Sequence, residues 1–459
     1  MKNMTLEQIA AACGGRYCGP KEKRNCEVSE IVTDSRKAGE GCLFVAIPGA
    51  RVDGHDFIPG VVKAGALAVI SEKDLGETDF PYIQVASSLK AVKDMAEYYL
   101  EQLGIPVIGI TGSVGKTSTK ETIASVLAQK YRVLKTEGNF NNELGLPLTV
   151  FRLREEHQIA VLEMGISDFG EMHRLARIAR PDTAVITNIG WCHLENLKTR
   201  DGILQAKTEI FDYLKEDGHI LLNGDDDKLS TVGEVKGITP IRFGLNAKNE
   251  YYADEIQSQG FLGISCRIHT PEGTFSALVP IPGRHMVYNA LAATAVGCVY
   301  GLTLEQIRRG IESLKAVNGR FHIIETGRYT VIDDCYNANP VSMKASLDVL
   351  GEGSGRKVAV LGDMGELGED EAKLHAEVGT HAAGCGIDAL YLAGPLCAHL
   401  AKAAQTANPA LEVRHFGSRE ELQEALGGLL QEGDNVLVKA SHFMQFEKIV
   451  AALTEGNEK

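Results

Sequence analysis

The chain has 459 residues, an apolar fraction of 44% and a formal net charge of −14. This length predicts about three domains with ordinary hydrophobic cores, and the acidic balance argues against broad binding to nucleic acid or acidic membranes. The first residues lack the apolar core of a signal peptide. No apolar run reaches the roughly 18–20 residues of a membrane span. We therefore expect a cytoplasmic protein without a membrane span.

Residues 1–103 are predicted to form a first α/β unit. The hydrophobic pattern favours a helix over 5–13, strands over 42–47, 66–70 and 82–85, and a helix over 89–103. Four cysteines cluster here, namely Cys13, Cys18, Cys26 and Cys42. Their gaps lack the paired C-x₂-C spacing of structural zinc, so we expect reduced, mostly buried thiols.

Residues 104–316 form the second predicted unit, and residues 317–459 the third. The second begins with a strand at Ile105, followed by helix 116–131, strand 159–164, helix 170–179, strand 183–189, helix 202–214 and strand 219–223. A β-rich stretch over 240–280 and a helix over 285–300 complete it. The third alternates helical patterns with strands over 329–333, 357–361, 389–393 and 435–439. In the second unit this alternation predicts a parallel sheet covered by helices on both faces, and the third unit is predicted to be a second α/β domain.

The segment 105–119 carries the strongest functional signal. An apolar, β-branched run enters the turn T-G-S-V-G-K-T, and a helical pattern follows. In a phosphate-binding loop of this kind, backbone N–H groups hold a polyphosphate, Lys116 neutralises it and Thr117 ligates Mg²⁺. The common loop would need glycine at Ile110, so this is a shorter form. Glycine alone indicates only a turn, but the Lys-Thr pair after a buried strand favours binding of ATP or a close relative.

Two further strands end in chemically active side chains. Glu163 ends strand 159–164, where a P-loop ATPase places its metal-organising acid. An acid there also serves as a loop cap, but beside a P-loop we expect a Mg²⁺ ligand or an orienter of metal-bound water. His193 follows the next strand, and ligands of open α/β sheets bind at the carboxyl ends of strands. A lone histidine is more often structural, yet this position favours a place beside Lys116.

Four other features have competing interpretations. Lys207 lies in an amphipathic helix, and the residues alone favour a solvated surface lysine. The loop 139–143 is rich in asparagine, which supports turns but at this density also favours contact with a sugar or phosphate. Asn289 is either a cap or a hydrogen-bond partner for adenine. Paired acids at Asp333 and Asp334 end a strand and suggest a ligand.

Taken together, these motifs resemble the Mur ligase family. The motifs, in family order and over nearly the whole chain, are T-G-S-x-G-K-T, N-x-N-N-E-x-G-x-P, E-M-G, T-N-I-G-x-x-H, A-K-x-E-I, G-x-H-x-x-x-N-x-x-A-A, N-G-R and D-D-x-Y-N-A-N-P. The last motif and G-D-M-G-E-L-G at 362–368 are similar to the member that adds D-alanyl-D-alanine. In the first unit, T-D-S-R at 33–36 and D-G-H-D-F at 53–57 resemble the UDP-sugar-binding domain of members that act on longer peptides.

The resemblance implies an α/β protein of three domains: an N-terminal UDP-sugar-binding domain, a central P-loop ATPase domain with a mostly parallel sheet and a C-terminal Rossmann-like domain. It implies that ATP phosphorylates the terminal carboxylate of a UDP-MurNAc-tripeptide, and that the amine of D-Ala-D-Ala attacks the acyl phosphate. The products are UDP-MurNAc-pentapeptide, ADP and phosphate, in the synthesis of peptidoglycan for the cell wall. The reaction brings an anionic carboxylate close to the anionic phosphates of ATP. Lys116 and two Mg²⁺ ions are therefore expected to supply positive charge. We expect a monomer.

The resemblance also assigns roles to residues. Lys116, His193 and Lys207 are the expected catalytic residues. Those expected to bind ATP are Thr111, Gly112, Ser113, Val114, Gly115, Lys116, Thr117, Ser118, Asn289, Arg320 and Asp334. Those expected to hold metal are Thr117, Glu163, His193 and Lys207. Those expected to bind substrate are Asp34, Ser35, Arg36, Asp53, His55, Asn139, Asn142, Glu143, Tyr336 and Asn337. Lys207 matches the family's carbamylated lysine, whose carbamate acts as an extra carboxylate, and this reverses the surface interpretation.

Two departures from the family pattern leave the D-Ala-D-Ala site open. The family's K-G-S-R reads K-A-S-H at 439–442, and Gly365 stands where a bulky residue is common. The third peptide residue, lysine or diaminopimelate, is also open. A folylpolyglutamate synthase is disfavoured because it lacks a UDP-sugar domain, and a P-loop kinase or NTPase switch because it needs no second full α/β domain. A binding-only protein is disfavoured because Lys116, Glu163 and His193 are all intact.

Overall fold

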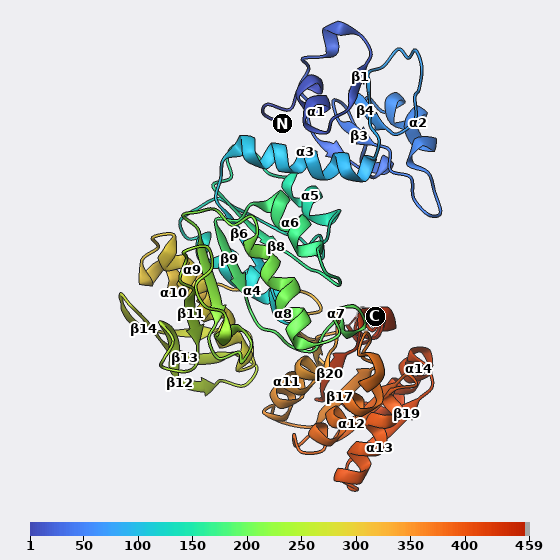
Figure 1. Cartoon of the computed structure of the whole chain (residues 1–459). Coiled ribbons are helices and arrows are strands. Elements are labelled where there is room, and N and C mark those ends of the chain that lie inside the picture. Colours follow the sequence, from blue (N-terminus) through green and yellow to red (C-terminus); the bar gives the residue numbers. More distant parts are fainter. Residues whose placement is uncertain (455–459) are drawn as a thin grey trace.

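The computed structural model describes residues 1–454, which form three α/β units in a row (Figure 1). Each unit has its own sheet, of five, nine and six strands. The strands of the three sheets come from residues 16–84, 107–279 and 322–439. The predicted three-unit α/β architecture is therefore confirmed, whereas the division at 104 and 317 stays a prediction.

The first unit is a small, mostly parallel sheet. Its strands are β1 (Arg16–Cys18), β2 (Ile31–Val32), β3 (Leu43–Val45), β4 (Ala68–Ser71) and β5 (Tyr82–Gln84), in the order β1-β5-β4-β3-β2. Its helices are α1 (Leu6–Ala12), α2 (Ile58–Lys63) and α3 (Ser88–Leu103). Only β1 is antiparallel to its neighbour. Ser87 caps α3 at its start, and Gly104 ends the helix in the left-handed conformation.

The central sheet is mostly parallel, as expected. Its strands are β6 (Val107–Thr111), β7 (Val133–Lys135), β8 (Ile159–Glu163), β9 (Thr183–Ile186), β10 (His219–Asn223), β11 (Ile241–Gly244), β12 (Tyr251–Ser258), β13 (Ile264–Thr270) and β14 (Gly273–Val279). The sheet order is β14-β13-β12-β11-β10-β9-β6-β8-β7, and only the β12–β13 and β13–β14 pairs are antiparallel. Every residue of β6, β8 and β9 is buried, which explains their continuous apolar sequences.

Helices cover both faces of the central sheet. They are α4 (Lys116–Leu127), α5 (Gly145–Val150), α6 (Glu171–Ala179), α7 (Leu194–Leu197), α8 (Arg200–Thr208), α9 (His285–Val299) and α10 (Leu304–Glu312). Along β8, Val161 packs in the core that contains α4, α9 and α10. Its neighbour Leu162 packs in the core shared by α6, α8 and α3 of the first unit. The first and central units are thus joined by one continuous core.

The third unit is a parallel sheet with one antiparallel edge. Its strands are β15 (His322–Glu325), β16 (Thr330–Asp333), β17 (Lys357–Gly362), β18 (Ala389–Ala393), β19 (Glu412–Phe416) and β20 (Asn435–Lys439), in the order β15-β16-β20-β17-β18-β19. Its helices are α11 (Pro340–Gly351), α12 (Glu371–Ala382), α13 (Cys397–Ala407), α14 (Arg419–Leu429) and α15 (Glu447–Thr454). The predicted strands at 389–393 and 435–439 are confirmed in full.

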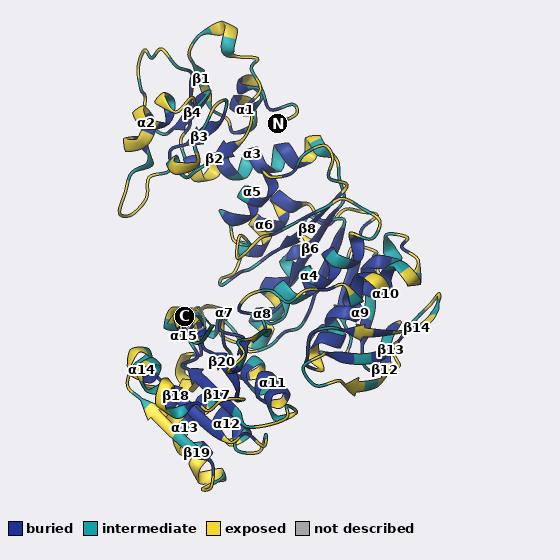
Figure 2. Ribbon diagram, turned by 180° about the vertical axis from the view of Figure 1, so that it is seen from behind, coloured by how far each residue is buried: buried dark blue, intermediate teal, exposed yellow. Residues whose placement is uncertain are grey.

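Several predicted bounds were wrong, and several short strands were not predicted. Helix 116–131 ends at Leu127, and helix 202–214 runs instead from Arg200 to Thr208, followed by a 3₁₀ turn. The pattern missed β1, β2, β7, β15 and β19. β19 has the mixed sequence E-V-R-H-F and lies exposed at the sheet edge, where no continuous apolar run is needed (Figure 2).

Two expectations from composition concern the whole chain. All ten cysteines, including the four of the first unit, are free thiols in the structure. From Met1 to Thr454, no helix combines the length and the apolar character that a membrane crossing requires.

Candidate active site

A cavity of about 840 Å³ lies between the central and third units. The phosphate loop and the ends of β8 and β9 line one side, and the ends of β16 and β20 line the other. Carboxyl ends of parallel strands meet at one edge of a sheet, so two such edges face each other across the cavity. This is the arrangement expected for an active site formed by residues of both units.

Most of the residues predicted to bind ATP or metal line this cavity. They are residues 113–118, Glu163, His193, Asn289, Arg320 and Asp334, joined by the predicted substrate residues Asn142, Tyr336 and Asn337. Thr111, Gly112 and Lys207 are buried and are not among the lining residues.

The phosphate loop is braced by the chain that follows β9. Gly112 has a φ of +150°, and a Cβ there would lie 1.9 Å from Thr187 Oγ1, so only glycine fits. Thr187 Oγ1 donates to the carbonyl of Val114 at 2.7 Å, and Asn188 Oδ1 accepts from the Val114 amide at 2.9 Å. The motif T-N-I-G at 187–190 predicted no role for Asn188. Its role is to hold the loop in shape.

Lys116 opens α4 directly after the loop. Its Nζ donates to the carbonyl of Gly112 at 2.9 Å. The unpaired N–H groups at the start of α4 and this ammonium face the same cavity, which is the arrangement that holds a polyphosphate.

Glu163 has one oxygen free to bind a cation. The side chain is 2% exposed, and its Oε1 accepts from Thr117 Oγ1 at 3.2 Å and from Asn141 Nδ2 at 2.9 Å. Its buried Oε2 accepts no hydrogen bond from residues 1–454, and the Lys120 ammonium lies 3.7 Å away. A buried carboxylate oxygen that accepts none of these hydrogen bonds and lies beside a hydroxyl fits Mg²⁺, which prefers hard oxygen ligands.

Asn141 and Lys120 were not predicted as site residues. Asn141 lies in the asparagine-rich loop, of which only Asn139, Asn142 and Glu143 were predicted to bind substrate. Lys120 is 1% exposed and stands four residues after Lys116, hence on the same face of α4. The four-residue spacing from Lys116 was the sequence signal that could have identified Lys120 as a site residue.

His193 contacts the third unit. Its Nδ1 lies 2.8 Å from Oε2 of Glu366, and both residues have left-handed backbones, with φ of 50° and 59°. The hydrogen bond from His193 lowers the pKa of Glu366. A carboxylate on one ring nitrogen orients the histidine and leaves the other nitrogen for a metal. Glu366, in G-D-M-G-E-L-G, was not predicted as a site residue.

Lys207 is not a surface lysine. Its side chain is 1% exposed, so the interpretation from the residues alone was wrong. Burial, and then the positive charge of Lys116, lower the pKa of Lys207 to about 7. A large fraction of this amine is therefore neutral and nucleophilic near neutral pH.

Arg320 links the two sides of the cavity. Its guanidinium lies 4.0 Å from the ring centre of Tyr336, and its Nη2 lies 3.5 Å from Thr117 Oγ1. The Tyr336 ring also meets the edge of the His442 ring at 5.6 Å between centres. Arg320 thus connects the third unit to the predicted metal ligand.

The K-A-S-H segment anchors the loop that follows β16. Lys439 Nζ lies 2.6 Å from Asp334 Oδ2 and donates to the carbonyl of Asn337 at 3.1 Å. Ser441 Oγ accepts from the Gly365 amide at 2.9 Å. A Cβ on Gly365 would lie 2.9 Å from the ring of Phe443, so Gly365 lets its loop pack closely against the segment that follows β20.

Two other predicted residues, Asn289 and Glu143, form contacts between helices. Asn289 Oδ1 accepts from Thr119 Oγ1 at 2.8 Å, which ties α9 to α4. Glu143 pairs with Lys93 and Arg174, so it joins α3 to α6, and the cavity lining includes neither Glu143 nor Asn139. Their substrate roles stay predictions.

The predicted sugar-binding residues lie in the first unit, apart from the cavity lining. They are Asp34, Ser35, Arg36, Asp53 and His55. His55 is buried and bonds Asp53 through Nδ1 at 2.6 Å, and Lys73 Nζ donates to the same carboxylate at 2.7 Å. The Arg36 side chain is 87% exposed beside Asp34, and its part in binding the sugar stays a prediction.

Three family models together match residues 27–297 and 319–442. They are "Mur ligase family, catalytic domain" over residues 27–117, "Mur ligase middle domain" over 110–297 and "Mur ligase, glutamate ligase domain" over 319–442. The UDP-N-acetylmuramoyl-tripeptide–D-alanyl-D-alanine ligase of Bacillus subtilis (strain 168) is 39% identical, and the match covers 99% of both chains.

Solved structures agree with this match. MurF from Acinetobacter baumannii superposes with a TM-score of 0.89 at 33% identity, covering 98% of this chain and 99% of that one. The MurF ligase from Thermotoga maritima in complex with ADP has a TM-score of 0.82 at 31% identity, covering 94% and 98%. The fold, the phosphate loop and these matches lead to one conclusion: this chain belongs to the Mur ligase family.

Proposed function

We propose that this chain is an ATP-dependent ligase that joins D-Ala-D-Ala to a UDP-MurNAc-tripeptide through an acyl phosphate. One observation carries the proposal: a single cavity holds the phosphate loop, the free Oε2 of Glu163 and the strand-end residues of the third unit. The name of the Bacillus subtilis protein supports the reaction and its two substrates. The ADP complex of the Thermotoga maritima protein supports the use of ATP.

In this proposal the loop and Lys116 bind the phosphates of ATP. Thr117 and Glu163 would hold Mg²⁺, and His193, oriented by Glu366, would hold a second ion. When bound, Mg²⁺ supplies the positive charge that lets a carboxylate approach a phosphate. Arg320 and the Asp334–Lys439 pair line the cavity on the side of the third unit, where they would approach the same phosphates.

Lys207 has a separate role in the proposal. A neutral amine attacks CO₂ at carbon, forms an N–C bond and loses one proton, which gives a carbamate. The buried, partly neutral Lys207 fits this chemistry, and the carbamate would add an oxygen ligand for the second metal ion. Charge balance also favours it, because a carbamate beside Lys116 replaces a repulsion with an attraction.

The first unit would bind the UDP-sugar end through Asp34, Ser35, Arg36, Asp53 and His55. We propose that the protein acts as a cytoplasmic monomer in peptidoglycan precursor synthesis. The ATP site and the UDP-sugar site then lie in different units, and the peptide must reach from one to the other.

A coupled assay of phosphate release tests the function. With ATP, Mg²⁺ and UDP-MurNAc-tripeptide, D-Ala-D-Ala should give turnover, and single amino acids such as L-glutamate and D-alanine should not. The tripeptides ending in lysine and in diaminopimelate, run in parallel, determine the third residue. Turnover with glutamate on a folate substrate, and none with D-Ala-D-Ala, would favour the folylpolyglutamate synthase alternative.

Ligands should bring the central and third units closer together. Contacts made from both sides of the cavity stabilise a closed arrangement over an open one. We expect a smaller radius of gyration in solution scattering with a non-hydrolysable ATP analogue plus UDP-tripeptide than without ligands. Glu366→Gln, which weakens the contact with His193, should lessen the change. An unchanged radius at saturation would mean that the site is preformed.

A further inference from the structure

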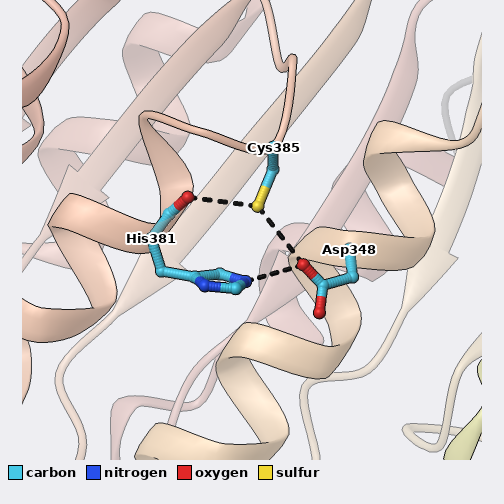
Figure 3. A group of neighbouring side chains, drawn as sticks. All are labelled: Asp348, His381 and Cys385. Atoms are coloured by element: carbon cyan, nitrogen blue, oxygen red, sulfur yellow. Dashed lines mark hydrogen bonds and ion pairs between the residues drawn. The ribbon is translucent and has the colours of Figure 1, made fainter.

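Three side chains of different chemistry meet on the third unit, away from the cavity lining (Figure 3). Asp348 lies on α11, His381 near the end of α12 and Cys385 in the turn that follows. His381 Nε2 is 2.6 Å from Asp348 Oδ1, and Cys385 Sγ lies 3.5 Å from the same oxygen. One ligand atom of each residue lies within 4.8 Å of the other two.

The backbone enforces this meeting. A Cβ on Gly351, at the end of α11, would lie 2.1 Å from the carbonyl oxygen of Cys385, so glycine allows the turn to pack directly on α11. Helices α11 and α12 also pack against each other along the sheet. Cys385 Sγ donates to the carbonyl of His381 at 3.2 Å, which fixes the thiol toward the cluster. The three groups are therefore held in place by α11, α12 and the turn.

We propose that Asp348, His381 and Cys385 bind one divalent cation of the zinc class, with water as a fourth ligand. Thiolate, imidazole and carboxylate form a mixed S, N, O set that suits Zn²⁺ and not Mg²⁺. Zinc bonds of about 2.0–2.3 Å require ligand atoms about 3.3–3.7 Å apart. The sulfur–oxygen distance of 3.5 Å already fits, and the nitrogen–oxygen pair needs to open by less than about 1 Å.

The site is accessible to an ion. The Asp348 side chain is 57% exposed and that of His381 33% exposed, so an ion and a water molecule can reach the cluster from solvent. Burial, and then the Asp348 carboxylate, raise the pKa of the Cys385 thiol to about 12. Binding therefore breaks the S–H bond, releases that proton to solvent and forms the S–metal bond. No oxidant or reductant is involved.

Binding would join α11 to the turn after α12. The first half of α11 lines the ATP cavity, and Ser346 Oγ donates to Asp334 at 2.6 Å. A cation on Asp348 would hold this helix from the opposite end, so we expect it to stabilise the third unit and raise the melting temperature. The site is separate from the chemistry of the ligase, and the inference holds whatever the cavity binds.

Titration of the full-length protein with Co²⁺ tests the proposal, because a thiolate ligand gives cobalt a near-ultraviolet charge-transfer band. In buffer with excess Mg²⁺, we expect one Co²⁺ per chain with this band, displaced by one Zn²⁺. Cys385→Ser should remove the band and weaken Zn²⁺ binding by about 100-fold or more, and Asp348→Asn should weaken it as well.

Three controls separate this site from others. Cys26→Ser removes a thiol of the first unit and should leave the band unchanged. Glu163→Gln should also retain it, because that residue belongs to the ATP cavity. Cys192→Ser tests the thiol next to His193. The absence of a band in the wild-type protein, its survival in Cys385→Ser or its loss in Cys192→Ser would overturn the assignment.

Discussion

Replacement of Lys116 by alanine should abolish ligation. Lys116 is the first residue of α4, and its Nζ lies at the phosphate loop, 2.9 Å from the Gly112 carbonyl. Lys120 cannot replace it, because that ammonium is buried against Glu121 and Glu163. Loss of one preorganised hydrogen-bond donor in an active site lowers a rate by about 100- to 1000-fold, and loss of the main phosphate cation should cost at least that much. Phosphate release at saturating UDP-tripeptide measures the effect.

Two variants serve as controls for Lys116. Lys90→Ala removes an exposed lysine of α3 that pairs with Asp94, and its activity should match the wild-type protein. Lys116→Arg keeps the charge but replaces a compact ammonium with a planar fork, so most of the loss should remain. Full activity in Lys116→Ala would show that the loop does not bind the phosphates.

Replacement of Lys207 by alanine should leave the enzyme nearly inactive. If Lys207 carries a carbamate, the variant loses a metal-supporting carboxylate, which typically costs at least about 10- to 100-fold. The alanine variant also leaves space for a small molecule in a buried site. Acetate or formate in the assay should therefore restore part of the activity, since a free carboxylate can occupy the place of the carbamate.

A volume-matched variant makes this test specific. Lys207→Met fills the same space without charge, so it should be inactive and should not respond to acetate. A short primary amine should rescue neither variant. Lys215→Ala, which removes a more exposed lysine paired with Asp182, should keep full activity. Full activity in Lys207→Met, or rescue by the amine in place of the carboxylate, would contradict a carbamate.

The sequence determined those features of this protein that depend only on residues close together in the chain. The phosphate loop is one strand, one turn and one helix within 105–119, so its residue types alone predict its shape and chemistry. The central strands β6, β8 and β9 are buried on both faces, and burial of that kind appears directly as continuous apolar sequence. Three α/β units and the position of Glu163 at a strand end follow from the same local signals.

Only the tertiary structure decided which distant side chains meet. Lys207 looks like a surface residue in its own helix, and it is buried because other elements pack over α8. His193 and Glu366, Asp334 and Lys439, and the cluster around Asp348 join residues far apart in the chain. No periodicity encodes such pairs, because each depends on how two folded elements pack. Local sequence therefore predicts the phosphate loop and the central buried strands, whereas packing between elements sets the charges and contacts of the site.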